Sequence, residues 1–257
     1  MAQTAQQPAR PRTGREFPYV LMYHSVTRYD DDPYLVTVCP ERFERQLRWL
    51  RSHGCTGVSM GELLAARRVG ADRGLVGLTF DDGYTDFAGT VVPLLRRFGW
   101  TATVFVIAGR LGGVNDWDPE GPRKQLMSEQ QVAAVAAAGM EVGSHGLWHR
   151  RLPELPATEL AAETERSRAV LREITGVPVG GFCYPYGAVD AESVSAVRAA
   201  GYEYGCAIWR SELSGRHALP RTYIGERDGS LRLGAKRMRH RFAARAEIPA
   251  PRLLRIR

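Results

Sequence analysis

Short apolar runs alternate with amphipathic segments along most of the chain. The runs with strand character are expected at 19–23, 56–58, 75–80, 101–107, 140–143, 179–184, 202–208 and 219–224. Helices are expected between them, at 40–54, 60–68, 91–99, 128–139, 157–174 and 191–200. The alternation predicts parallel β–α units and, at 257 residues, a closed or nearly closed α/β barrel. A doubly wound open sheet is the alternative.

Side chains that can act in catalysis or bind a metal ion follow directly after several of these predicted strands. They are His24, Asp81, Asp82, His145, His149 and Tyr186. In parallel α/β folds the active site is built at the carboxyl ends of the strands. The pattern therefore predicts one site assembled from four strand ends. Taken alone, Asp81-Asp82-Gly83 is also ordinary turn chemistry that can simply end a strand.

His145 and His149 are four positions apart, so their imidazoles would face the same way if this segment were helical. A pair of this kind can also merely cap or pack. Together with Asp82 it forms a set of two histidines and one carboxylate, which leaves metal positions open for water and substrate. Catalytic zinc uses such a set, and cobalt, nickel or iron also accept these ligands.

The overall composition is that of an ordinary globular protein, with 44% hydrophobic and 25% charged residues. No apolar run reaches the roughly 18 residues of a membrane span. Residues 1–17 lack an apolar core segment, so they are expected to form a disordered arm rather than a secretory signal, and the protein is expected to be cytoplasmic. The cysteines are scattered and are expected to be free thiols: Cys39, Cys55, Cys183 and Cys206.

The formal net charge is +7, and much of the excess lies in 226–257, which is expected to be a basic C-terminal tail. Phe242 is the only aromatic residue among its arginines, which argues against a stacking surface for nucleic acid. The tail is interpreted as a solvated segment. The alternative is weak attraction to an anionic membrane surface or to a phosphorylated substrate carrier.

Three motifs occur in a fixed order: Thr-Phe-Asp-Asp-Gly at 79–83, His-x-x-x-His at 145–149 and Tyr-Pro-Tyr-Gly at 184–187. Together they resemble the polysaccharide deacetylase family (NodB homology, carbohydrate esterase family 4). The resemblance implies a distorted (β/α) barrel of seven or eight strands, in a single domain over 18–225. It also implies a divalent metal ion, with zinc expected first and cobalt or nickel as alternatives. The implied reaction is removal of an N-acetyl group from an N-acetylglucosamine-type sugar.

By position in these motifs, Asp81 corresponds to the general base and Asp82 to the metal-binding aspartate, with His145 and His149 as the other ligands. Tyr186 corresponds to the residue whose backbone N–H helps to hold the oxyanion. These roles fit the chemistry of amide hydrolysis, because an amide carbonyl is a poor electrophile. A metal ion can polarise that carbonyl and can also lower the pKa of the attacking water. A carboxylate beside that ion can accept the proton of the water.

The chain departs from the family pattern at several points. Gly146 stands where serine or threonine is usual, and this is expected to remove only a small supporting hydrogen bond. Cys183 stands where an arginine commonly orients the base. Arg221 either replaces that arginine or lies on the surface. The usual motif for the general acid is missing, and His24 is favoured over His217 for that role.

Substrate contacts are expected from five residues. They are Tyr84 directly after the first motif, Pro185 in the third motif, Asn115 and Trp117 in the long loop at 112–127, and Arg221 in the last strand. The expected substrate is a carbohydrate, such as a short oligosaccharide, a lipid- or nucleotide-linked sugar, or an exopolysaccharide precursor. The alternatives are hydrolysis of a small non-sugar amide and, more distantly, an inactive carbohydrate-binding module. The sequence gives no indication of the oligomeric state.

Overall fold

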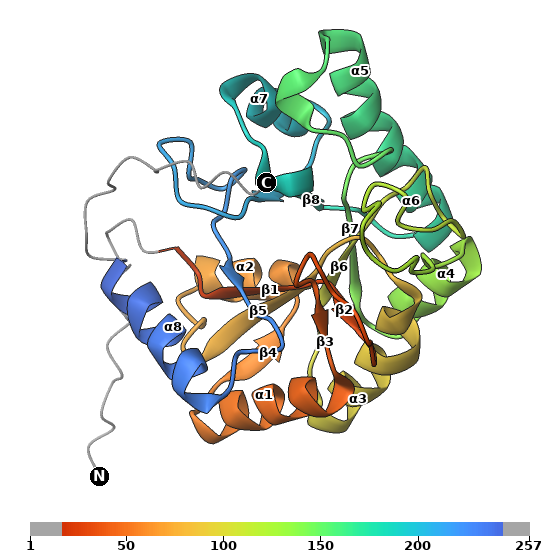
Figure 1. The fold of residues 1–257 in the computed structure, drawn as a ribbon. Helices are drawn as coiled ribbons and strands as arrows, with labels where there is room; N and C mark the ends of the chain where they lie inside the picture. The colour runs from red at the N-terminus through yellow and green to blue at the C-terminus, as the bar shows by residue number, and fades with distance from the viewer. Residues whose placement is uncertain (1–16, 244–257) are drawn as a thin grey trace, which may run out of the picture.

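The computed structural model describes residues 17–243, which form a strongly curved parallel sheet with helices on its outer side (Figure 1). Its eight strands are β1 (Val20–Tyr23), β4 (Thr56–Val58), β5 (Leu75–Phe80), β6 (Thr103–Val106), β7 (Glu141–Ser144), β8 (Gly181–Cys183), β9 (Tyr204–Cys206) and β10 (Thr222–Tyr223). A separate two-stranded sheet pairs β2 (Ser25–Val26) with β3 (Thr37–Val38).

The strand order explains why the barrel is distorted. It runs β10-β1-β5-β6-β7-β8-β9, with β4 also pairing with β5. The first half of β5 pairs with β4, up to Gly77, and its last two residues pair with β6. The ends of the order approach each other, because Leu219 forms a parallel bridge to Cys206 just before β10 pairs with β1. The predicted α/β barrel is thus confirmed, in an incompletely closed form.

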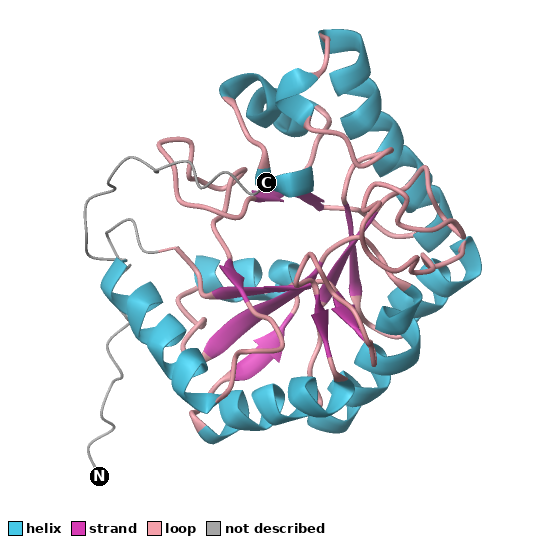
Figure 2. Cartoon of the chain, viewed as in Figure 1, coloured by secondary structure: helices cyan, strands magenta, loops and turns pink. Residues whose placement is uncertain are grey.

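Helices surround the strands, as Figure 2 shows in cyan around magenta. Their bounds are α1 Pro40–Ser52, α2 Met60–Arg68, η1 Phe87–Val91, α3 Val92–Phe98, α4 Glu129–Ala137, η2 Leu152–Glu154, α5 Ala157–Ala161, η3 Ala162–Arg166, α6 Ser167–Thr175, η4 Pro185–Gly187, α7 Ala191–Ala199 and α8 Ser230–Ala243. A capping box between Ser128 and Gln131 starts α4. The single helix expected at 157–174 is interrupted by a π-helical turn, η3.

The core fixes the strand ends from which the polar residues project. Tyr23 and Phe80 are the last residues of β1 and β5, and their rings stack at 5.2 Å. Phe43 of α1 and Phe87 of η1 pack edge-on against Phe80, and all four side chains are almost completely buried. Burying each of these rings contributes about 2–3 kcal/mol. His24 and Asp81, which come next in the chain, therefore start from rigid positions.

The expected boundary between the barrel and a basic tail at residue 226 is wrong. Helix α8 begins at Ser230 and lies beside α1, as Figure 1 shows in blue and orange. Leu233 is buried, Lys236 bonds to Asp228 at 2.6 Å, and Arg237 donates to the carbonyl of His53 at 3.1 Å. One buried leucine and a few polar anchors hold this arginine-rich helix in place. Residues 1–16 of the expected arm and residues 244–257 of the expected tail lie outside the described residues.

Two other expectations concern membranes and thiols. Within residues 17–243, the helices are too short or too polar for any of them to cross a membrane. All four cysteines are free thiols, as predicted, and only Cys39 is not fully buried.

Candidate active site

Asp82, His145 and His149 meet at the carboxyl ends of β5 and β7. The Oδ1 atom of Asp82 lies 3.4 Å from Nε2 of His145 and 3.5 Å from Nε2 of His149, and all three side chains are buried. Their ligand atoms lie within 4.8 Å of one another. A zinc-type ion bonds to nitrogen and oxygen at about 2.0–2.2 Å, so one ion can bind all three. The donor set and its spacing therefore fit a divalent metal ion.

The histidines are arranged as metal ligands usually are. Nδ1 of His145 is hydrogen-bonded to the carbonyl of Cys183 at 2.8 Å, which turns Nε2 toward Asp82. Burial, followed by repulsion from His145 and His24, lowers the pKa of His149 to about 3, although Asp82 opposes this shift. A neutral imidazole has the free lone pair that a metal ligand needs.

The segment from His145 to His149 is not helical, so the geometry assumed from the four-residue spacing is wrong. It is an irregular loop in which Gly146 has φ +80° and His149 has φ +62°. Asp82 and Tyr186 also have positive φ values, of 72° and 57°. A left-handed residue other than glycine costs roughly 1–2 kcal/mol. The concentration of such residues around one centre is typical of a functional site.

Glu163 holds this loop and was not anticipated from the sequence. Its buried Oε2 accepts hydrogen bonds from the backbone N–H groups of Leu147, at 2.6 Å, and Trp148, at 3.0 Å. A Cβ atom on Gly146 would lie 2.7 Å from the same oxygen. Gly146 therefore does more than omit a side-chain hydrogen bond, because it lets the carboxylate approach the backbone. The π-turn η3 places Glu163 there, and helix periodicity alone does not reveal it.

We expect Glu163→Gln to weaken metal binding by about 10- to 100-fold, as losses of groups that orient metal ligands do. The amide keeps one acceptor but loses the negative charge that binds two N–H groups. Gly146→Ala should have a similar effect, and the double variant should lose less than the sum, because both changes disturb one contact. Metal affinity measured by competition with a chelator tests this.

Glu165→Gln is the matched control, because Glu165 is an exposed carboxylate on the same turn. Equal metal affinities for Glu163→Gln and Glu165→Gln would contradict a positioning role for Glu163.

Asp81 is buried beside the metal-ligand cluster and is bound by Arg221. Its two carboxylate oxygens accept hydrogen bonds from Nη1 and Nη2 of Arg221 at 2.6 and 2.7 Å. Burial acts to raise the pKa of Asp81, but the charge and hydrogen bonds of Arg221 outweigh it and lower the pKa. The Arg221 side chain has no exposed surface, so its assignment as a substrate-binding residue is wrong.

Cys183 explains how Arg221 reaches this position. The Sγ atom of Cys183 lies 3.0 Å from Nη2 of Arg221 and 3.6 Å from Oδ2 of Asp81. The small side chain leaves space that an arginine from the segment before β10 fills. The sequence left open whether Arg221 replaces the usual arginine beside the base or lies on the surface. In the structure it is buried beside Asp81.

His24 lies at this site and His217 does not. Nε2 of His24 is 3.9 Å from Oδ2 of Asp81. Nε2 of His217 is instead hydrogen-bonded at 3.0 Å to the carbonyl of Tyr202, which precedes β9 at the opposite end of the sheet. The backbone after His24 is anchored by Asp86, to which no sequence motif points. Asp86 accepts hydrogen bonds from the side chain of Ser25 and the N–H of Val26 at 2.6 and 3.0 Å.

The residues expected to contact substrate fall into two groups. Trp117 and Tyr186 each place a ring 4.5 Å from the ring of His149, and Tyr186 is 41% exposed, so both lie beside the metal-ligand cluster. Tyr84 and Pro185 are buried, as is Asn115. For these three, a contact with substrate stays a prediction.

Asn115 braces the loop that carries Trp117. Its side chain accepts a hydrogen bond from the N–H of Lys124 at 2.6 Å and donates one to the carbonyl of Pro122 at 3.2 Å. Asp118 of the same loop is a further acidic group near the site. Burial and then repulsion from Asp82 raise its pKa to about 6.

Comparisons with known proteins place this chain in a family. The family profile described as polysaccharide deacetylase matches residues 68–205, so the chain belongs to the polysaccharide deacetylase family. A solved structure, the Streptococcus pyogenes deacetylase PplD in complex with acetate, has a TM-score of 0.74 at 21% identity. The structural match covers 86% of this chain and 97% of the PplD chain, so the two proteins share a fold.

Two relatives by sequence are similar over most of this chain. The Bacillus subtilis (strain 168) protein YxkH is 27% identical over 188 residues, which are 72% of this chain and 62% of YxkH. The poly-β-1,6-N-acetyl-D-glucosamine N-deacetylase of Staphylococcus aureus (strain MSSA476) is 22% identical over 203 residues, which are 74% of this chain and 68% of that enzyme. The matched region thus spans under two thirds of YxkH.

Proposed function

We propose that this protein is a metal-dependent hydrolase that removes the N-acetyl group from an N-acetylated amino sugar. The observation that carries the proposal is the position of Asp81. It is an ionised, arginine-bound carboxylate next to a cluster of one aspartate and two histidines that fits a divalent ion. Membership of the polysaccharide deacetylase family supports the carbohydrate substrate. The S. aureus relative is named for N-deacetylation of a β-1,6-linked N-acetylglucosamine polymer.

Asp82, His145 and His149 would hold the metal ion, and zinc is the ion we propose, with cobalt or nickel as alternatives. When bound, the ion would polarise the amide carbonyl and lower the pKa of a water molecule. Asp81 would accept the proton of that water, and Arg221 keeps Asp81 ionised for the purpose.

His24 would donate a proton to the leaving amine from its position 3.9 Å from Asp81. The backbone N–H of Tyr186 would stabilise the oxyanion. The exposed Tyr186 and the nearby Trp117 would hold the sugar against the cluster, because aromatic faces pack well on sugar rings.

Acetate release tests this proposal. Chelator-treated protein is incubated with N-acetylglucosamine oligomers and with nucleotide-linked N-acetylglucosamine, before and after zinc or cobalt is added back. Acetate that appears only with metal supports the deacetylase and begins to define its substrate. Metal binding without acetate from any sugar would contradict a sugar substrate and favour a small non-sugar amide. The expected cytoplasmic location is a separate proposal, tested by fractionating cells that produce the protein.

We expect His24→Gln to lower kcat by roughly 10²–10⁴-fold, because a glutamine cannot protonate the leaving amine. The measurement is kcat for acetate release by the metal-loaded protein. His217→Gln is the control and should retain nearly full activity, since His217 lies at the other end of the sheet. A larger loss for His217→Gln than for His24→Gln would contradict this assignment.

A further inference from the structure

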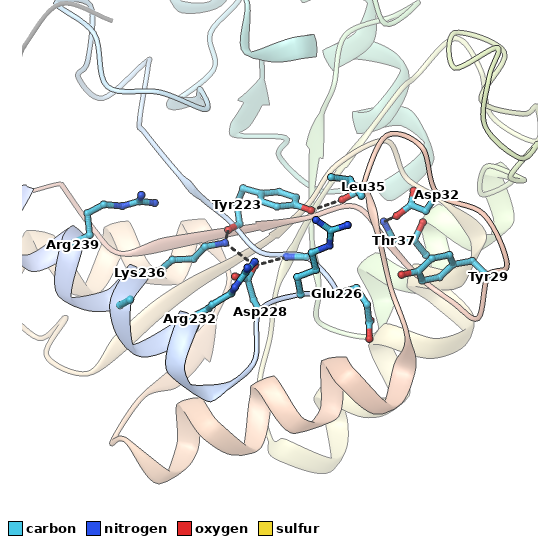
Figure 3. Close-up of a pocket in the computed structure, with 13 residues that line it drawn as sticks. Tyr29, Asp32, Leu35, Thr37, Tyr223, Glu226, Asp228, Arg232, Lys236 and Arg239 are labelled. Atoms are coloured by element: carbon cyan, nitrogen blue, oxygen red, sulfur yellow. Dashed lines mark hydrogen bonds and ion pairs between the residues drawn. The ribbon is translucent and has the colours of Figure 1, made fainter. Parts of the chain in front are cut away.

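A cavity of about 680 Å³ lies between the segment at 29–37 and helix α8, as Figure 3 shows. Tyr223 of β10 crosses its centre and donates a hydrogen bond to the carbonyl of Leu35. Tyr223 is in register with Met22 of β1. The cavity therefore opens near the strand end that also carries His24, but its lining includes none of the proposed catalytic or metal-binding residues.

The acidic residues of this cavity already have partners. Asp32 accepts hydrogen bonds from two backbone N–H groups, at 3.2 and 2.8 Å. Glu226 accepts from the N–H of Cys39 at 2.8 Å and from Nε of Arg42 at 3.3 Å. Asp228 accepts from the N–H of Gly225 at 2.8 Å and pairs with Lys236 at 2.6 Å. None of these carboxylates needs a positively charged ligand.

The basic residues of the cavity are not balanced in the same way. Arg227, Arg232 and Arg239 line it, and within residues 17–243 none of them forms an ion pair with a carboxylate. Together with Lys236 they give the lining four basic side chains against three acidic ones, Asp32, Glu226 and Asp228, so its formal charge is +1. A concave surface concentrates such a potential and raises the local concentration of anions.

We propose that this cavity binds a phosphate-type anion, either free or as the phosphate group of a phosphorylated sugar. Guanidinium groups bind phosphate oxygens through two parallel N–H donors, and a phosphate dianion can engage more than one arginine. The volume is within the range of small-molecule sites, about 300–1,000 Å³, and exceeds what a lone phosphate fills. The rings of Tyr29 and Tyr223 offer apolar faces for a sugar.

This proposal does not depend on the deacetylase activity, and a binding measurement on the full chain tests it. Isothermal titration would compare N-acetylglucosamine 1-phosphate, inorganic pyrophosphate and uncharged N-acetylglucosamine. The test variant is Arg232→Gln with Arg239→Gln. The matched control, Arg172→Gln with Arg198→Gln, makes the same change in charge at exposed positions on α6 and α7.

We expect saturable binding of the phosphorylated ligand, at least tenfold weaker in the cavity variant and within twofold of the original protein in the control. Tighter binding of the sugar phosphate than of pyrophosphate assigns the site to a phosphorylated sugar, and equal binding assigns it to the free anion. The absence of saturable binding would overturn the proposal. Equal weakening in both variants would do so too, because it would reflect net charge alone. Phosphate bound only at the metal-ligand cluster would leave the cavity variant unaffected and would also overturn it.

Discussion

Asp82→Ala is expected to lose its bound metal and its hydrolytic activity together. Asp82 supplies the oxygen that lies 3.4–3.5 Å from both histidine nitrogens, and two buried imidazoles alone make a much poorer site. Metal content after dialysis and acetate release are the two measurements. Asp82→Asn is a useful companion variant, since asparagine tolerates the φ of +72° better than alanine does. It separates loss of a ligand from backbone strain.

Asp81→Asn should behave differently from Asp82→Ala, although the two residues are adjacent. The amide has almost the shape of the carboxylate but cannot accept a proton, so activity should fall by roughly 10²–10⁴-fold while metal binding persists. An Asp82→Ala protein that kept normal metal content and activity would show that the metal ligands have been wrongly assigned. Loss of metal in Asp81→Asn would show that the two aspartates do not have separate roles.

The strand ends and their chemistry could be predicted because the necessary information is local. The apolar run that became β5 ends at Phe80, and Asp81 and Asp82 follow it at the rim of the sheet. The backbone of the site could not be predicted in the same way. Left-handed conformations at Asp82 and His149 depend on packing and hydrogen bonds from distant segments, so the four-residue spacing alone does not reveal the irregular loop at 145–149.

Two further features depended on contacts far apart in sequence. Glu163 is 16 positions from Leu147, whose N–H it accepts, and Arg221 is 140 positions from Asp81. Single-sequence patterns do not encode such pairs: the departure at Cys183 left Arg221 as one of two possibilities, and Gly146 pointed only to a lost hydrogen bond. Helix α8 could not be predicted as part of the fold, because its sequence is rich in arginine. Its buried Leu233 is not part of a clear apolar pattern.

Arg221→Met is expected to destabilise the protein and to impair catalysis at the same time. It leaves Asp81 buried without its cation, and breaking a buried ion pair in this way costs about 3–5 kcal/mol. With Arg221 in place, the lowered pKa of Asp81 gives stability that is present above the unfolded-state pKa of about 3.9 and is lost as pH falls through the folded-state value. In the variant, burial raises the pKa of Asp81 instead, so the base needs a higher pH to ionise.

Urea unfolding between pH 3 and 8 and the pH dependence of kcat/KM measure the two effects. Arg216→Met is the control, because Arg216 is an exposed residue 3.8 Å from Glu203, and such pairs contribute at most about 1 kcal/mol. Adding Cys183→Arg to Arg221→Met should restore part of both properties, since it returns an arginine to the position beside Asp81 where the family commonly has one. Unchanged stability and pH dependence in Arg221→Met would mean that Arg221 does not keep Asp81 ionised. Rescue by Cys183→Arg would show that the charge beside Asp81 matters more than the segment that supplies it.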